Sequence, residues 1–541
     1  MKPLLDVRPD HLEIIQKILR RHVPGREIWA FGSRATWTAK EHSDLDLAVI
    51  GEEPLSFQTL GALRDDFSES DLPYKVDVVD WATTSESFRE IIRKDKVVVQ
   101  TTQGLNPASL SKWTKIPLGD LVRNLDSRRV PLSSREREIK RGTYPYYGAT
   151  GIMDYVDDFL FEGLHLLIAE DGSVETKDGK PFLQLVDGKF WVNNHAHVLK
   201  GKTDEDTKFL YYALSTVAIR PFISGSVQGK LSQKNLNQIP IFYPINDDMR
   251  HVIVSILGAL DDKIELNRKI NETLEAAARA IFKDWFVDFS PVRAKAAGKK
   301  PYGMDDATAA LFPDSFEDSE LGEIPRGWRV GALESVLGEL EVGGRPKGGV
   351  SAYTEGVPSI GAESIAGLGI FDFSKTKYVP REFFEAMAKG HIQNRDVLLY
   401  KDGGRPGEFE PHATLFGENF PYATCAINEH VYRIRAKPEI GQNFLFFWLS
   451  SDFLMEEMRV KGTGVAIPGL NSTQVKSLTT LVPSPEISKA FNSLVDPYVT
   501  RVLSNCNESR TLAVLRDALL PGLMSGEVRV REVEKITGAA I

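Results

Sequence analysis

Two segments of the chain carry the same long pattern of apolar positions. Over residues 253–285, apolar side chains recur at alternating intervals of three and four residues, and Asn267 is the only polar residue at the first position of any heptad. A shift of 238 residues reproduces the pattern over residues 491–523 and places Asn505 at the position of Asn267. Each segment is predicted to form a long helix. We expect the two apolar stripes to pair as a coiled coil in which the two asparagines face each other.

The residues ahead of each helix repeat as well. Residues 231–244 run from a leucine to a proline before the first helix, and residues 470–483 do the same at an offset of 239 before the second. A repeat with so long a period indicates duplicated domains rather than a solenoid. We expect two similar globular heads held apart by the helix pair. The alternative is two ordinary core helices whose patterns match by chance.

The remaining patterns predict the secondary structure of the N-terminal part and of the two heads. The first 105 residues show an amphipathic helix near 7–21, strand-like runs at 27–31, 45–50 and 76–79, and a helix near 85–94. Beyond residue 116, short apolar runs broken by glycine, aspartate and asparagine predict mostly β heads on both sides of the first long helix. The predicted fold class is α+β and multidomain. An N-terminal α/β domain precedes two similar mixed α/β, β-rich heads, which are separated by the two coiled-coil-forming helices.

Composition narrows the class of protein. The 541 residues are 42% hydrophobic, with a net charge of -9 and a mean hydropathy of -0.22, values of a soluble globular chain. No run of eighteen apolar residues and no apolar signal segment occurs, so we expect no membrane partner and a cytoplasmic location. Cys425 and Cys506 are the only cysteines, which argues against disulfides and structural zinc. The acidic balance argues against a protein that coats nucleic acid by bulk charge.

A basic run opens the first head. Seven arginines and lysines lie within residues 123–141, and the aromatic segment Thr143-Tyr-Pro-Tyr-Tyr-Gly148 follows at once. Basic side chains interleaved with tyrosines suit a surface that tracks phosphates and stacks on bases, although a solvated basic face explains such a run about as well. The second head carries a flexible basic loop at Gly343-Gly-Arg-Pro-Lys-Gly-Gly349. The predicted DNA-binding residues are Arg128, Arg129, Tyr146, Tyr147, Lys230, Arg345 and Lys347.

Dispersed strings over residues 113–530 resemble the DNA-specificity subunit of type I restriction-modification systems. The strings are Leu125-Asp-Ser-Arg-Arg-Val-Pro-Leu-Ser-Ser-Arg-Glu-Arg137, Tyr144-Pro-Tyr-Tyr-Gly-Ala149, Leu167-Ile-Ala-Glu-Asp-Gly-Ser173, Phe190-Trp-Val-Asn-Asn-His-Ala-His-Val198, Phe282-Lys-Asp-Trp-Phe-Val-Asp-Phe289 and Leu515-Arg-Asp-Ala-Leu-Leu-Pro521. The resemblance implies two target-recognition domains that each read half of a split site in double-stranded DNA. It also implies that the helices act as a spacer and as a docking surface for modification subunits, two of them, and that a restriction or translocase subunit completes the complex.

Catalytic motifs are absent from this main body. It has neither an Asn-Pro-Pro-aromatic run for methyl transfer nor a Gly-x4-Gly-Lys-Ser/Thr loop, so S-adenosylmethionine is expected only through the partner methyltransferase subunit. Asp171, Glu175 and Lys177 are residue types found in nucleases, but their turn-rich surroundings favour a hairpin surface. His195 and His197 have no third ligand nearby in the sequence, which favours structural roles.

The N-terminal motif Ala30-Phe-Gly-Ser-Arg-Ala35, with Ser43-Asp-Leu-Asp-Leu47 and Lys75-Val-Asp-Val-Val79, has the spacing of a metal-dependent phosphate site. Gly32 and Ser33 at a strand-to-helix turn can hold a phosphate on backbone N–H groups, and Asp44 and Asp46 alternate along one strand and point to the same face. With Asp77 from the adjacent strand they make three carboxylates, enough for two Mg²⁺ ions and in-line displacement at the α-phosphate of an NTP.

This motif set resembles the minimal nucleotidyltransferases of the polymerase β-like superfamily. The resemblance implies Asp44, Asp46 and Asp77 as catalytic and metal-binding residues, and Gly32, Ser33 and Arg34 as nucleotide-binding residues, with Mg²⁺ and an NTP as cofactors if the domain is active. A domain kept only for docking is the alternative.

These interpretations give a full domain assignment. The expected limits are a nucleotidyltransferase-like domain at 1–105, target-recognition domains at 113–245 and 323–485, spacer helices at 246–289 and 486–530, and a linker at 290–322. Two functions compete. One is a sequence-specific DNA-binding specificity subunit with an added N-terminal domain. The other is a nucleotidyltransferase enzyme that the two heads direct to DNA or protein.

Overall fold

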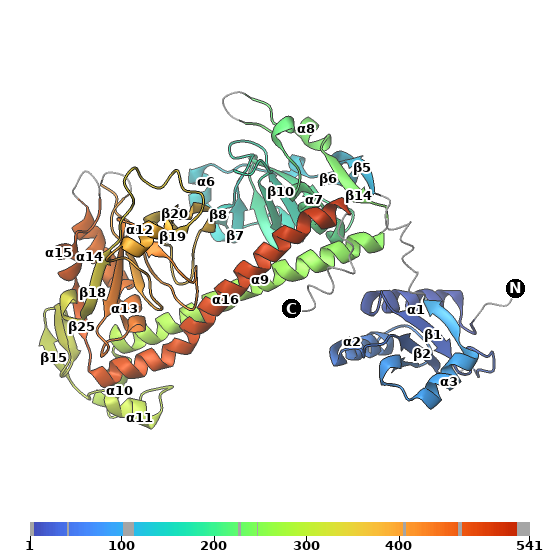
Figure 1. The fold of residues 1–541 in the computed structure, drawn as a ribbon, viewed down its shortest axis with the longest axis horizontal. Helices are drawn as coiled ribbons and strands as arrows, with labels where there is room; N and C mark the ends of the chain where they lie inside the picture. The colour runs from blue at the N-terminus through green and yellow to red at the C-terminus, as the bar shows by residue number, and fades with distance from the viewer. Residues whose placement is uncertain are drawn as a thin grey trace. The chain divides into compact units, whose positions relative to one another are not determined.

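The computed structural model describes residues 5–40, 43–100, 113–225, 229–245, 247–403, 407–463 and 468–526 (Figure 1). The chain divides into two compact units, Met1–Val252 and Ile253–Ile541, each a mixture of helix and sheet. No helix in the described ranges is both long enough and apolar enough to cross a membrane.

A four-stranded sheet forms the N-terminal domain, drawn in blue in Figure 1. Its elements are α1 (Pro9–His22), β1 (Glu27–Phe31), β2 (Leu45–Ile50), α2 (Phe57–Ser68), β3 (Val76–Asp80), α3 (Glu86–Asp95) and β4 (Val97–Gln100). The strand order is β3-β2-β1-β4, with β2 parallel to β3 and antiparallel to β1. Ile15 and Leu19 of α1 and Leu63 of α2 are fully buried in one core with the sheet, because the apolar stripes of the helices cover it.

The first head, from β5 to β14, contains two four-stranded sheets and a terminal strand pair. Its strands are β5 (Trp113–Pro117), β6 (Arg123–Asn124), β7 (Arg141–Tyr147), β8 (Ile152–Val156), β9 (Phe161–Glu162), β10 (His165–Ala169), β11 (Leu183–Val186), β12 (Lys189–Val192), β13 (Ala196–Lys200) and β14 (Pro240–Pro244). Its longer helices are α6 (Ser134–Ile139), α7 (Asp204–Ser215) and α8 (Gln233–Asn237). The sheets have the orders β11-β10-β13-β6 and β8-β7-β12-β9, and β5 pairs with β14. The last pairing closes the head because it joins its first strand to its last.

The second head repeats most of this strand order, although one of its two sheets has three strands instead of four. Its strands are β17 (Arg329–Ala332), β18 (Leu337–Val342), β19 (Val357–Ile360), β20 (Lys377–Val379), β21 (Val397–Tyr400), β22 (Ala413–Leu415), β23 (Ala426–Ile427), β24 (Val431–Ala436) and β25 (Thr479–Val482). Its helices include α12 (Arg381–Ala386), α13 (Gln442–Leu449), α14 (Asp452–Gly462) and α15 (Ser472–Lys476). The sheet β22-β21-β24-β18 corresponds to β11-β10-β13-β6, the parallel pair β19-β23 corresponds to β7-β12, and β17 pairs with β25 as β5 does with β14.

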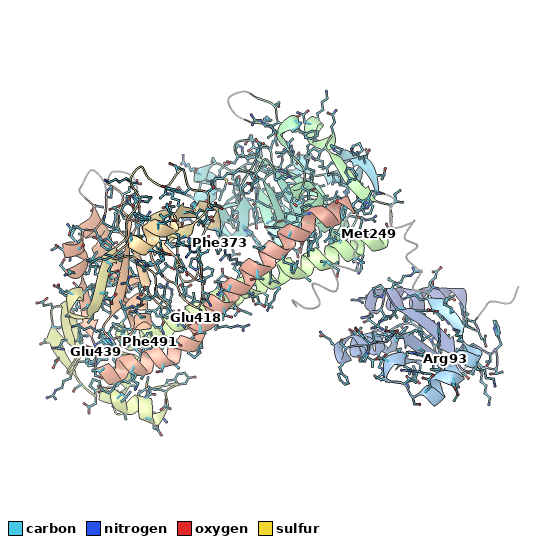
Figure 2. The ribbon with its side chains drawn as sticks, viewed as in Figure 1. Arg93, Met249, Phe373, Glu418, Glu439 and Phe491 are labelled. Atoms are coloured by element: carbon cyan, nitrogen blue, oxygen red, sulfur yellow. The ribbon has the colours of Figure 1, made fainter. Side chains whose placement is uncertain are left out.

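Two long helices, α9 (Asp247–Phe286) and α16 (Pro485–Ser525), run antiparallel beside each other (Figure 1). Arg516 forms an ion pair with Asp261 at 2.6 Å. Near the other end of the seam, the ring of Phe491, which Figure 2 labels, lies 5.8 Å from the ring of Phe282. Residue numbers therefore fall along α16 as they rise along α9. Buried apolar residues of both helices, such as Val495, join the core of the second head.

The expectation that Asn267 and Asn505 face each other is wrong. Asn267 Nδ2 donates to Glu508 and to Ser509 Oγ at 2.8 and 3.2 Å, whereas Asn505 Nδ2 donates to Asn271 Oδ1 at 2.8 Å. An antiparallel pair sets a first heptad position of one helix against a fourth position of the other, so the two asparagines occupy neighbouring layers. The shift that maps Asn267 onto Asn505 also maps Asn271 onto Ser509, so the two layers are copies of each other.

Residues 290–322, expected as a linker, are folded. They form α10 (Ser290–Ala296), α11 (Asp306–Leu311) and β15 (Phe316–Ser319), which pairs with β16 (Gly322–Pro325). Val292 and Phe312 are buried, and the Phe312 ring meets the ring of Trp285 on α9 edge-on at 5.0 Å. A few apolar anchors thus pack the segment against the end of the helix pair despite its polar composition.

Candidate functional site

The N-terminal carboxylates meet on two adjacent parallel strands. The register of β2 and β3 sets Asp46 beside Asp77, and Leu45 N donates to Lys75 O at 2.9 Å, which sets Asp44 beside Lys75. Because side chains alternate along a strand, Asp44, Asp46, Lys75 and Asp77 project from the same face. The sequence predicted the three carboxylates, called the carboxylate cluster below, but assigned no role to the lysine between them.

Gly32 brings a backbone turn against this cluster. It follows β1 with φ of 75°, and a Cβ atom built there would lie 2.5 Å from Asp46 Oδ2. Only glycine combines that conformation with so close an approach. The expected helix does not follow; residues 33–37 form turns in which Thr36 N donates to Gly32 O at 3.1 Å and Thr38 N to Ser33 O at 2.9 Å.

Arg34 lies inside the domain rather than at its surface. Its side chain donates to the carbonyl oxygens of Ser43 and Asp6 at 2.8 and 3.0 Å, and its guanidinium lies 3.8 Å from the centroid of the Tyr74 ring. The residue is 7% exposed. These contacts hold the loop after Gly32 against the residues that lead into β2. Arg34 therefore helps to position the carboxylate cluster from inside the domain.

Charge repulsion is built into the cluster. Burial raises the pKa of Asp46 above its ordinary value, and the charges of Asp77 and Asp44 raise it further, while Lys75 opposes the shift. The hydrogen bond to Asp77 raises the pKa of Lys75. Three carboxylate oxygens on one face are the hard ligands that Mg²⁺ prefers, so these residues fit a magnesium site.

The predicted DNA-binding residues of the first head differ in exposure. Arg128 is exposed and donates to Leu160 O at 2.6 Å, and Lys230 is exposed beside Glu170 at 3.4 Å. Arg129 is engaged inside the head, where it donates to Glu170 at 2.8 Å and to Ala196 O at 2.7 Å. Tyr146 is 1% exposed and its hydroxyl accepts from Leu132 N at 2.9 Å, which leaves it no face for a base. Tyr147 is half-buried against Phe190.

In the second head both predicted contacts lie on the surface. Arg345 pairs with Glu429 at 2.8 Å and keeps 59% of its side chain exposed, and Lys347 is exposed two residues later. Both belong to the segment between β18 and β19.

A junction of loops that sequence reasoning missed recurs in both heads. In the first head, Asp171 contacts His195 Nδ1 at 2.7 Å, and His195 N donates to Asn193 Oδ1 at 2.8 Å. In the second, Asp402 contacts His430 Nδ1 at 2.5 Å, and His430 N donates to Asn428 Oδ1 at 2.9 Å. The backbone bonds repeat as well, because Leu231 N donates to Glu170 O and Leu470 N to Lys401 O, both at 2.8 Å. The Asp-Gly and Asn-x-His strings in each half were the available sequence signal.

A metal-like group lies beside this junction in the first head. Asp126, Glu170 and His197 offer ligand atoms within 4.8 Å of one another, so two carboxylates that are distant in the sequence lie beside His197 in the fold. Both ring nitrogens are already engaged, however, Nδ1 with Asp126 at 2.6 Å and Nε2 with Leu231 O at 2.7 Å. Although burial opposes it, the hydrogen bond from His197 holds the pKa of Asp126 below its ordinary value. These contacts leave the imidazole no free nitrogen for a metal ion.

An acidic cleft of about 600 Å³ opens beside the junction of the second head. Its lining residues are Ala362, Glu363, Ile365, Tyr400, Asp402, Gly403, Glu408, Glu410, His412 and His430. Four carboxylates in one cleft repel a phosphate backbone, so this cleft is unsuited to holding one.

Comparison with known proteins assigns the two parts separately. Residues 13–103 match the family described as polymerase β nucleotidyltransferase, and residues 110–276 match the type I restriction modification DNA specificity domain. A probable protein adenylyltransferase, MntA, of Haemophilus influenzae is 57% identical over 96 residues, 18% of this chain and 84% of that protein.

The main body has relatives of another kind. A putative type I restriction enzyme specificity subunit of Haemophilus influenzae is 40% identical over 144 residues, 27% of this chain and 36% of that protein. The MjaIX specificity subunit of Methanocaldococcus jannaschii is 24% identical over 335 residues, 60% of this chain and 70% of that protein. Through residues 13–103 the chain therefore belongs to the polymerase β-type nucleotidyltransferases, and through residues 110–276 it contains a type I restriction modification DNA specificity domain.

Proposed function

We propose that residues 113–530 act as the DNA-binding specificity subunit of a type I restriction-modification complex. The repeated head carries this proposal, since two heads with closely matching strand orders and the same loop junction are suited to bind two DNA half-sites in the same way. Each head, 113–245 and 323–485, would read one half of a bipartite site in double-stranded DNA. Arg128, Lys230, Arg345 and Lys347 are the exposed candidates for backbone contacts.

The helix pair supports a spacer role. Helix α9 has 40 residues and α16 has 41, so each is about 60 Å long, the rise of about 18 base pairs of B-DNA. We propose that spacer helices 246–289 and 486–530 form a coiled coil that sets the gap between half-sites and docks two modification subunits, to which a restriction or translocase subunit adds. S-adenosylmethionine would enter only through the modification subunits.

Methylation mapping of the whole complex tests this function. Co-expression of the full chain with its modification subunits is expected to methylate a motif made of two short sequences separated by a gap of fixed length. A contiguous motif would refute the two-reader architecture, because it would leave one head without a half-site.

For the N-terminal domain we propose Mg²⁺-dependent transfer of an adenylyl group from ATP to a hydroxyl group of a partner protein. The similarity to a probable protein adenylyltransferase supports this reaction. The carboxylate cluster would hold the metal ions, which when bound offset the charge of the triphosphate. The Gly32–Ser33 turn offers backbone N–H groups to phosphate oxygens, and Arg34 holds that turn in place.

The reaction balances without a further reactant. The hydroxyl oxygen of the acceptor attacks the α-phosphorus, the bond to the bridging oxygen of the β-phosphate breaks, and pyrophosphate leaves with that electron pair. The hydroxyl proton passes to water by way of a carboxylate of the cluster.

Incubation of the full chain with ATP labelled at the α-phosphate, together with lysate proteins, tests the reaction. Label on protein is expected with the wild type and is expected to vanish when Asp44→Asn and Asp46→Asn are combined. The same double variant should keep site-specific DNA binding. Its loss would show that the N-terminal domain is coupled to DNA recognition, contrary to the separable parts proposed above.

A further inference from the structure

The carboxylate cluster carries its own counter-ion. Lys75 Nζ lies 2.5 Å from Asp77 Oδ1, and the lysine directly precedes β3, two residues before that aspartate. Across the parallel register, Lys75 stands next to Asp44 just as Asp77 stands next to Asp46. One ammonium group and three carboxylates thus occupy neighbouring positions on two strands.

The position of Lys75 in the sheet defines one edge of the site. Strand order β3-β2-β1 sets Lys75, the residue before β3, at one side, Asp44 and Asp46 at the start of β2 in the middle, and the turn of Gly32 and Ser33 after β1 on the other side. A triphosphate that lies over the aspartates would therefore have backbone N–H groups on one flank and an ammonium on the other. Both groups interact favourably with the negative charge of a triphosphate.

Exposure leaves the lysine free to change partner. Its side chain is 68% exposed, whereas that of Asp77 is 43% exposed. An exposed ion pair contributes little net stability, so displacing the ammonium costs little. A divalent ion at the cluster brings more positive charge than the lysine does and takes the same carboxylate oxygens, so the two compete for Asp77.

We propose that Lys75 is an internal counter-ion that neutralises the carboxylate cluster in the free domain and moves from Asp77 to an oxygen of the triphosphate when magnesium nucleotide binds. This inference rests on the proposed nucleotide-binding function. It assigns Lys75 as a positioning residue with opposite effects on two ligands: its charge weakens the binding of the metal ion alone and strengthens the binding of the metal–nucleotide complex.

Metal binding alone gives the first measurement. In the full chain, Lys75→Met is expected to tighten Mn²⁺ binding, followed by electron paramagnetic resonance, about three- to tenfold, because a positive charge close to the metal is removed. Lys75→Arg keeps the charge and should bind Mn²⁺ like the wild type. Lys94→Met removes an exposed lysine on α3 and serves as the matched control.

Nucleotide binding gives the second measurement. The affinity for the magnesium complex of an ATP analogue with a methylene group between the α- and β-phosphates, measured by calorimetry, should fall about tenfold or more in Lys75→Met and change little in Lys75→Arg. Unchanged or weaker Mn²⁺ binding in Lys75→Met overturns the counter-ion role, and an unchanged nucleotide affinity overturns the transfer to the triphosphate.

A third variant separates this inference from the proposed function. Combining Asp44→Asn with Asp46→Asn should abolish Mn²⁺ binding at the cluster and so defines the signal that belongs to it. If that variant loses the Mn²⁺ signal but Lys75→Met behaves like the wild type, the metal site is supported and the counter-ion role of Lys75 is refuted. If the wild type binds neither Mn²⁺ nor the magnesium–nucleotide complex, the proposed nucleotidyltransferase function is itself refuted.

Discussion

Replacing the two seam asparagines by leucine should stabilise the second unit. Asn267 and Asn505 are 0% and 1% exposed, yet each leaves its Oδ1 atom without a hydrogen-bond donor among the described residues. In Asn267→Leu combined with Asn505→Leu, three hydrogen bonds from the Nδ2 atoms are lost, at a cost of about 3 kcal/mol. Removing the two Oδ1 atoms that lack a donor raises the free energy of unfolding by about 2 kcal/mol, and burying two leucine side chains raises it by about 3 kcal/mol. Both values are the low ends of the usual ranges for such changes. The expected net gain is about 2 kcal/mol.

Urea unfolding of the full chain, followed by fluorescence of the second unit's tryptophans, measures this gain. Asn507→Leu is the matched control on the same helix, because Asn507 Nδ2 donates to Glu418 O at 2.6 Å outside the seam and its loss should lower stability by about 1 kcal/mol. A double variant less stable than the wild type would refute the reasoning. It would mean that the hydrogen bonds of the two asparagine layers form a network that stabilises the fold by more than the sum of its separate bonds.

The same substitution should loosen register. A buried polar layer disfavours shifted pairings, because a shift sets the amide against apolar side chains, whereas leucine tolerates several registers. The variant complex is therefore expected to accept DNA sites whose gap is one base pair longer or shorter than the wild-type gap. Competition binding with a set of gap lengths tests this, and an unchanged preference would place the control of register outside the asparagine layers.

Three further outcomes follow from the geometry. Because the helices are antiparallel, inserting four residues after Asn271 alone should abolish site-specific methylation, whereas a matched insertion before Asn505 as well should restore it with a gap about two base pairs longer in the methylation map. Burial lowers the pKa of His165, so the first head should lose stability as pH falls through the ordinary histidine value near 6.5, and His165→Phe should remove that part of the pH dependence of the melting temperature. Gly32→Ala sets a Cβ atom against Asp46 in a backbone conformation with φ of 75°, and calorimetry should show at least about a tenfold loss of magnesium nucleotide affinity.

Sequence reasoning predicted the features that repeat over long stretches. The heptad pattern located both long helices, because a period held over five heptads has few other physical explanations. The alternation of Asp44 and Asp46 placed both carboxylates on one strand face for the same kind of reason. Helix direction was beyond reach, since a stripe of apolar positions suits a parallel and an antiparallel partner alike. The expected pairing of Asn267 with Asn505 failed on that point.

Features that depend on a few distant contacts were missed. Residues 290–322 have the composition of a linker, and only packing shows that Val292 and Phe312 anchor them. Arg34 belongs to the motif predicted to bind phosphate, but it is turned inward by the carbonyl oxygens of Ser43 and Asp6 and by Tyr74, which lie nine or more residues away in the sequence. Burial of a charged side chain depends on such partners and cannot be derived from local pattern.

The repeated junction separates framework from variable surface within a single chain. Both heads keep the aspartate–histidine pairs Asp171–His195 and Asp402–His430, while the residue before each aspartate changes from glutamate to lysine, and the residue two beyond each histidine changes from His197 to Tyr432. His197 Nε2 and the Tyr432 hydroxyl nevertheless contact the carbonyl oxygens of corresponding leucines, at 2.7 and 3.0 Å. Under the proposed function the two heads read different half-sites, so features that they share, such as the junction, are assigned to the framework. Arg129, whose bonds end inside that framework, is then a structural residue, and the search for base-reading side chains belongs to the exposed segments where the two heads differ, such as the one that carries Arg345 and Lys347.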